Sequence, residues 1–151
     1  MYIGLSLNVA NEWGQFIAQI FKGINLSRYE WEIITDDIIY KDTQAHGLFS
    51  KNIVSSKVFE AAISKPEYYT IFADFKAYPI GSERTNFNSF DGFMNSNCEI
   101  HFICYDVEFI EIYCKQSKLL DMLYSNCKKV AVGSVAYVSE GIASNQKLFA
   151  F

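Results

Sequence analysis

The 151-residue sequence lacks the segments that direct a chain into or across a membrane. No apolar run approaches the roughly 20 residues that a membrane-spanning helix needs. The stretch from Met1 to Leu7 has neither a basic region nor a small-residue cleavage site, so it does not resemble a signal peptide. We therefore expect a soluble, cytoplasmic protein with no membrane partner. Four cysteines inside apolar segments favour the same compartment, as reduced thiols: Cys98, Cys104, Cys114 and Cys127.

Positive charge is also scarce. Thirteen Lys and Arg residues face seventeen Asp and Glu residues, which gives a net charge of −4. A protein that binds duplex nucleic acid needs a basic stripe to neutralise phosphates, and the largest basic run here is Lys128-Lys129. These counts argue against a nucleic-acid duplex as partner, although a site for a single nucleotide stays open.

Motifs that bind phosphate or activate a nucleophile are missing. The sequence contains no Gly-x-Gly-x-x-Gly, no P-loop and no Gly-x-Ser-x-Gly. Cys98, His101 and Cys104 are metal-ligand types at three-residue spacing, but they fall in a predicted strand. Side chains alternate along a strand, so both cysteines should point away from His101, and they should lie ~20 Å apart. We therefore expect no metal and no cofactor.

Aromatic residues, by contrast, are abundant: 13 Phe, 10 Tyr and 2 Trp make up 17% of the chain. Aromatic side chains favour strands and large packing surfaces. Most of them should therefore lie in a core or on a sheet face. A stacking or interface surface built from the remainder stays open as an alternative.

Hydrophobic periodicity predicts an α+β fold. Strands are expected at residues 2–8, 31–35, 38–41, 69–78, 98–105, 108–114 and 130–138. Helices are expected from an N-cap at Asn11 to Gly23, from Ser55 or Ser56 to Pro66, and over residues 118–128. Asp36-Asp37 and Asp106-Val107 should form hairpin turns. The resulting order, β-α-β-β-α-β-β-β-α-β, predicts one domain over residues 1–151, with a mostly antiparallel sheet of six or seven strands and about three helices.

Two stretches carry a resemblance to a known family. The first runs from Gly4-Leu5-Ser6-Leu7-Asn8 through Asn11-Glu12-Trp13-Gly14 to Tyr29-Glu30-Trp31-Glu32-Ile33. The second runs from Asn97-Cys98-Glu99-Ile100 through Tyr105-Asp106 to Ile112-Tyr113-Cys114-Lys115, followed by Asn126-Cys127. Both are similar to an uncharacterised family of small proteins of Bacillus-like bacteria, a domain of unknown function. The resemblance implies a bacterial cytosolic origin and brings no catalytic residue, cofactor or partner.

The longest irregular segment, from Ser82 to about Ser96, is the best candidate for a binding surface. It interleaves aromatic rings with amides and one Arg, which suits recognition of a small polar ligand or a protein partner. The same composition suits a loop whose Phe side chains simply pack into the core. The candidate binding residues are Arg84, Asn86, Phe87, Asn88, Phe90 and Phe93.

A second candidate is a polar site assembled from distant residues: Asp74, His101, Cys104 and Glu111. It would make the protein a small enzyme. We favour a non-catalytic binding or interaction module, because no spacing concentrates reactive groups. Contact of His101 with any of the other three inside a cleft would overturn this preference. The apolar end, Leu148-Phe149-Ala150-Phe151, is expected to fold back on the sheet or to dock on a second copy, so a homodimer stays open.

Overall fold

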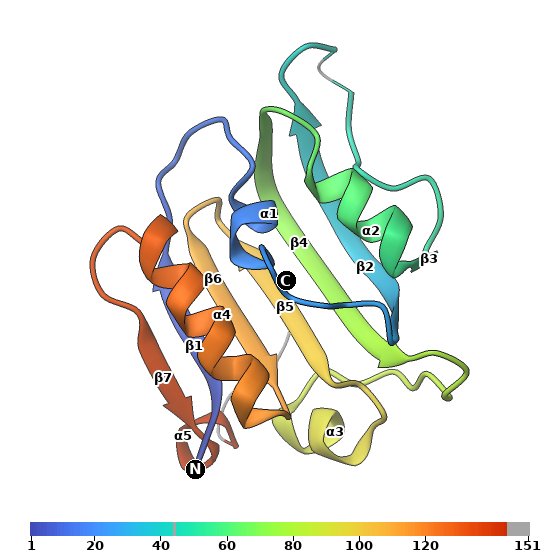
Figure 1. Ribbon diagram of the computed structural model, residues 1–151, viewed down its shortest axis with the longest axis vertical. Helices are drawn as coiled ribbons and strands as arrows, with labels where there is room; N and C mark the ends of the chain where they lie inside the picture. Colours follow the sequence, from blue (N-terminus) through green and yellow to red (C-terminus); the bar gives the residue numbers. More distant parts are fainter. Residues whose placement is uncertain (44, 145–151) are drawn as a thin grey trace.

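One antiparallel sheet organises the protein in the computed structural model, which describes residues 1–43 and 45–144 (Figure 1). Within these residues the sheet has seven strands in the order β3-β2-β4-β5-β6-β1-β7, and all neighbours are antiparallel. Their bounds are β1 Tyr2–Asn8, β2 Tyr29–Tyr40, β3 Ile53–Ser55, β4 Tyr68–Pro79, β5 Ile100–Tyr105, β6 Phe109–Cys114 and β7 Ala136–Ser139. The predicted α+β class with a mostly antiparallel sheet is confirmed.

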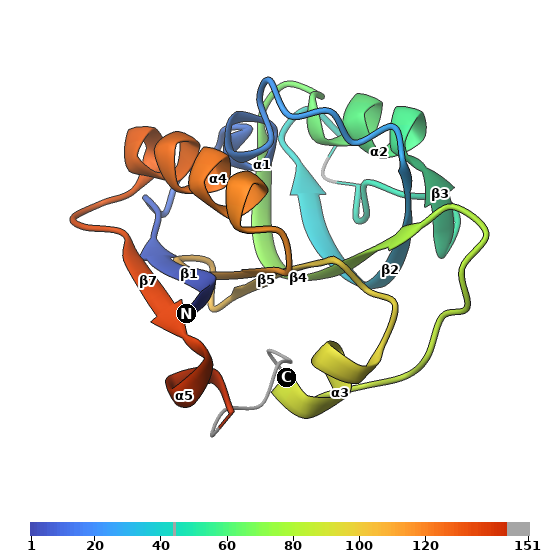
Figure 2. The same cartoon turned by 60° about the horizontal axis from the view of Figure 1, so that its bottom comes forward.

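Helices cover both faces of this sheet (Figure 2). One face, called the three-helix face below, carries α1 (Phe16–Ile20), α2 (Ser56–Ile63) and α4 (Ser117–Val130). The other, called the α3 face, carries the short helices α3 (Phe90–Asn95) and α5 (Glu140–Ala143). No helix among residues 1–43 and 45–144 is long and apolar enough to cross a bilayer.

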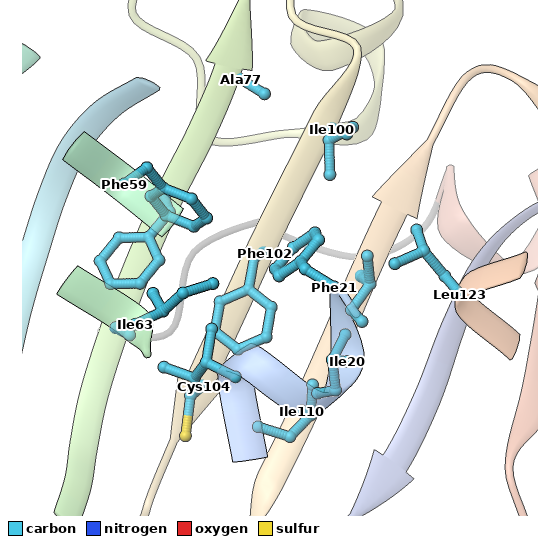
Figure 3. Packing of buried hydrophobic residues seen from close by; sticks show 14 of the residues in the cluster. Ile20, Phe21, Phe59, Ile63, Ala77, Ile100, Phe102, Cys104, Ile110 and Leu123 are labelled. Carbon is cyan, nitrogen blue, oxygen red and sulfur yellow. The ribbon is translucent and has the colours of Figure 1, made fainter. Parts of the chain in front are cut away.

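The main core fills the three-helix face and is built from rings. Phe59 of α2 stacks on Trp31 of β2, with ring centroids 3.8 Å apart and planes 2° from parallel. Phe21 meets both rings edge-on, at 5.6 and 5.8 Å. Figure 3 shows Phe21, Phe59 and Phe102 converging above the strands. Much of the aromatic excess is therefore packing material, as the composition predicts.

The predicted hairpin at Asp36-Asp37 is wrong. These residues lie within β2, a single 12-residue strand that pairs with β4 along its length, with register shifts between Ile33 and Thr35 and between Asp37 and Ile38. Instead of turning the chain, the Asp36 carboxylate accepts hydrogen bonds from the backbone N–H groups of Leu48 and Phe49, both at 2.9 Å. Acidic residues favour turns because their carboxylates accept hydrogen bonds from nearby backbone N–H groups. Here the carboxylate of Asp36 accepts them from the loop at Leu48 and Phe49 instead.

Several other boundaries also differ. α1 begins at Phe16 with Gln15 at its N-cap, so Asn11 lies too far upstream to cap it. The Asn11 side chain accepts a hydrogen bond from the Tyr69 hydroxyl. The long loop contains α3, which Ser89 caps through the N–H of Gly92. β7 is shorter than the predicted last strand.

The turn at Asp106-Val107 is found, and both residues have positive φ, at 51° and 69°. The apolar end from Leu148 to Phe151 lies outside the described residues.

Candidate functional site

The alternation of strands places three ionisable side chains on the α3 face. Asp74 and Lys76 are two residues apart on β4, so they point to the same side of the sheet. His101 on β5 lies directly opposite Lys76 in the antiparallel register. These side chains are almost entirely buried: 3% of Asp74, 4% of Lys76 and none of His101 is exposed. Buried ionisable groups are costly, so their partners decide what this region does.

Asp74 and His101 form a hydrogen bond of 2.6 Å between Oδ1 and Nε2. Complete burial lowers the pKa of His101, and the neighbouring carboxylate only partly offsets that effect. We therefore assign a neutral imidazole that donates its Nε2–H to Asp74 and leaves Nδ1 as an acceptor. Nδ1 is buried and has no hydrogen-bond partner within residues 1–43 and 45–144.

The loop of residues 82–89 lies against these groups because sheet side chains hold its carbonyls. Lys76 Nζ donates to the carbonyl of Phe87 at 3.0 Å and lies 3.8 Å from the centre of its ring. The Tyr78 hydroxyl donates to the carbonyl of Thr85 at 3.1 Å. The Phe87 ring packs edge-to-face against His101, with centroids 5.5 Å apart. The 82–89 loop thereby covers His101.

A pocket of about 460 Å³ lies between this loop, β2 and β4. It is lined by Ile34, Thr35, Asp74, Lys76, Asn86, Phe87 and Asn88. Asp74 and Lys76 are its most buried members, so they form its inner end, whereas Asn86 and Asn88 are exposed at the rim. The pocket thus brings together three residues of the predicted loop surface and one of the predicted polar site.

The other predicted loop residues lie elsewhere. Arg84 forms an ion pair with Glu30 at 3.0 Å and does not line the pocket. Phe90 and Phe93 are buried in a second core cluster on the α3 face, beside Tyr78 and Tyr113. The core-packing interpretation of the loop therefore holds for these two rings.

The predicted polar site is only partly assembled. Cys104 points to the three-helix face and packs in the main core, so the sheet separates it from His101 (Figure 3). Glu111 shares the face of His101, but Ile103 stands between it and Asp74 in the register. Burial raises the pKa of Glu111, and its side chain hydrogen-bonds to Tyr113. Of the four residues, only Asp74 and His101 meet.

One prediction about strand faces is wrong. Cys98 precedes β5, which begins at Ile100, and it packs with Tyr78 and Phe93 on the α3 face. The alternation expected from residue 98 onward does not apply to it. No three His, Cys, Asp or Glu residues in the described ranges are arranged to hold a metal.

The sequence pattern did not single out Lys76 as a site residue. The alternation of side chains along the strand nevertheless places it on the same face as Asp74. Thr35 and Ile34 carried no signal, because their place in the pocket depends on the irregular register of β2. Long-range strand pairing, rather than any local motif, gathers this site.

Comparison with known proteins agrees with the resemblance seen in the sequence. "Uncharacterized protein YncE" of Bacillus subtilis (strain 168) is 28% identical over 140 residues, which cover 91% of this chain and 92% of that protein. No solved structure matches the chain. A family model described as "Protein of unknown function (DUF2691)" matches residues 2–149. The chain therefore belongs to the DUF2691 family.

Proposed function

We propose that the protein is a non-catalytic binding module that holds a small polar ligand in the pocket between the 82–89 loop and β4. The observation that carries the proposal is the pair of buried charged side chains, Asp74 and Lys76, at the inner end of that pocket. Binding sites typically place a few polar groups in a concave surface, where they fix the orientation of the ligand. The rim amides of Asn86 and Asn88 add donors and acceptors that suit a polar molecule.

A larger pocket, of about 520 Å³, lies between α1 and α2. Its charged lining residues, Lys22 and Glu60, are exposed side chains on the helix surfaces. Solvated charges of this kind are the ordinary state of a protein surface and need no ligand. The pocket beside β4 is therefore the stronger candidate despite its smaller volume.

A small enzyme is the second candidate, and the contact between Asp74 and His101 favours it. This contact alone does not give a substrate access to His101. Of the two residues only Asp74 lines the pocket, and His101 is fully buried behind Phe87. Cys104 is on the opposite face. Proton transfer by His101 would require the 82–89 loop to move, so binding without chemistry is the simpler account of this geometry.

A thermal-shift screen against polar metabolites tests the proposal. A ligand at 100 times its Kd stabilises the native state by about 2.7 kcal/mol, which for a domain of this size raises Tm by about 5–11 °C. We expect at least one compound to produce such a shift. The double variant Asn86→Ala/Asn88→Ala should reduce it without unfolding the protein, because both side chains are exposed.

The matched control is Asn52→Ala, which removes an exposed amide outside the pocket and should leave the shift unchanged. A panel without any stabilising compound would count against a small-molecule ligand. An equal loss of shift in Asn52→Ala would show that the ligand binds elsewhere.

Self-association is a further proposal for the β7 edge of the sheet. β7 ends the strand order, and Met1, Tyr2 and Ile142 beside it are more than half exposed. A strand edge without a neighbour among the described residues, next to apolar side chains, favours pairing with a second copy. Light scattering coupled to size-exclusion chromatography tests it, and a monomer at high concentration would reject it.

A cytoplasmic location is also proposed. It is supported by the four cysteines, which are all buried and unpaired, as expected in a reducing compartment. Fractionation of cells that express a tagged copy tests the location, and recovery of the protein outside the cytoplasm would reject it.

A further inference from the structure

Among the described residues, no lysine or arginine forms an ion pair with the Asp74 carboxylate. Within residues 1–43 and 45–144 its one ion-pair partner by distance is His101, whose neutral ring contributes a hydrogen bond and no charge. Lys76 is engaged elsewhere, because its ammonium group lies on the Phe87 ring and donates to the Phe87 carbonyl. A buried charge normally has a partner of opposite sign, since an uncompensated one is strongly destabilising.

The unpaired side of this carboxylate faces the pocket. His101 occupies Oδ1, and no hydrogen bond of the described residues reaches Oδ2. Asp74 is nonetheless among the residues that line the pocket, so its small exposed area belongs there. The hydrogen bond from His101 fixes the position of the Asp74 carboxylate, because the imidazole ring is itself fully buried against Phe87. Oδ2 is therefore a fixed acceptor at the inner end of a concave site.

From this arrangement we infer that the ligand is a small primary amine, such as a free amino acid, whose ammonium group pairs with Asp74. The inference rests on the proposed function and names the ligand class for the same pocket. An ammonium group supplies both the charge and the hydrogen-bond donors that Asp74 Oδ2 lacks.

The charges around the pocket disfavour an anion. Glu32 lies opposite Lys76 on β2, and one of its carboxylate oxygens is buried without a hydrogen bond in the described part of the chain. Arg84 is paired with Glu30. A ligand with only negative charge would meet Asp74 in the pocket, where Lys76 is the one cation among the lining residues and already contacts Phe87. Like-charge contact is costly.

Matched probes separate the ammonium group from the rest of the ligand. The twenty free L-amino acids, their N-acetyl derivatives and their methyl esters are each titrated by calorimetry, with neutral hexoses as a fourth set. We expect binding by free amino acids or methyl esters and loss of binding on N-acetylation, which removes the positive charge. The methyl esters decide whether the carboxylate end contributes as well.

Substitution of Asp74 tests its pairing with the ammonium group. Asp74→Asn keeps an acceptor for His101 but loses the charge, so it should weaken amine binding by at least about thirty-fold. Glu83→Gln, on the same loop but outside the pocket, is the control and should change nothing. Thermal unfolding of each variant shows that it is folded.

Failure of the amine assignment and failure of the proposed function give different results. Binding of hexoses or N-acetyl derivatives that the Asn86→Ala/Asn88→Ala variant weakens would overturn the amine assignment and leave the pocket as a binding site. Amine binding that is unchanged in Asp74→Asn would show that Asp74 does not hold the ammonium group. Binding that none of the pocket variants alters would defeat both the amine assignment and the proposed function.

Discussion

The buried imidazole of His101 predicts a specific dependence of stability on pH. Burial lowers the pKa of His101 in the folded protein below its ordinary value of 6.5. As pH falls through 6.5, the unfolded chain therefore takes up a proton that the folded chain does not. The contribution of His101 to stability is complete above this pH and is lost below it, by about 1.4 kcal/mol per pH unit at the limiting slope. The loss between pH 7.5 and 5.5 is therefore at most about 1.4 kcal/mol, the value for an imidazole that takes up no proton in the folded state.

Urea unfolding of wild type and His101→Gln across this pH range isolates the effect. Gln retains a donor for Asp74 but does not titrate, so the pH-dependent loss should disappear in the variant. Carboxyl groups with raised pKa values, such as Asp36 and Glu111, contribute with the opposite sign, but they are present in both proteins and cancel. His46→Asn, which replaces an exposed histidine, is the control and should retain the loss.

A difference in unfolding free energy between wild type and His101→Gln that grows as pH falls would refute this reasoning. It would mean that His101 is protonated in the fold. Asp74 would then possess a counter-cation, and the amine inference would lose its premise.

Three further outcomes follow from the packing. Phe59→Ala should lower the free energy of unfolding by about 3–5 kcal/mol, because the ring stacks on Trp31 in a fully buried site; a loss below 1 kcal/mol in urea unfolding would contradict this. Gly4→Ala should cost about 1–3 kcal/mol, since a Cβ there would lie 2.8 Å from Tyr113 Cδ1, whereas Gly14→Ala, with nothing within 4 Å, should be close to neutral; equal effects would argue against the tight contact. Burial raises the pKa of all four thiols, Cys98, Cys104, Cys114 and Cys127, to about 12. A thiol reagent at pH 8 should therefore label the native protein slowly and the unfolded protein at all four cysteines. Rapid labelling of the native protein would contradict the burial of these cysteines.

The sequence predicted the parts of the fold that depend on local pattern. The alternation from Tyr69 to Tyr78 became β4, and the turn at Asp106-Val107 was found. The prediction was wrong where a residue with a strong local preference for turns makes a long-range contact instead. Asp36 is a good turn former, but the loop at Leu48 and Phe49 occupies its carboxylate and the strand continues.

The candidate site shows the same division. Alternation alone put Asp74 and Lys76 on one strand face, and composition singled out the loop that contains Asn86 to Asn88. Their meeting could not be predicted, because it depends on hydrogen bonds from Lys76 and Tyr78 to loop carbonyls. Every residue has a backbone carbonyl, so the sequence of the loop does not reveal which carbonyls accept these hydrogen bonds.

The location of the binding site is tested most directly by NMR shift mapping. Uniformly ¹⁵N-labelled protein is titrated in turn with a mixture of free L-amino acids and a mixture of hexoses. The account predicts that the amino acids shift the amide signals of Thr35, Asp74, Lys76 and residues 86–88, which surround the pocket. Unchanged spectra, or shifts confined to the pocket between α1 and α2, would contradict it.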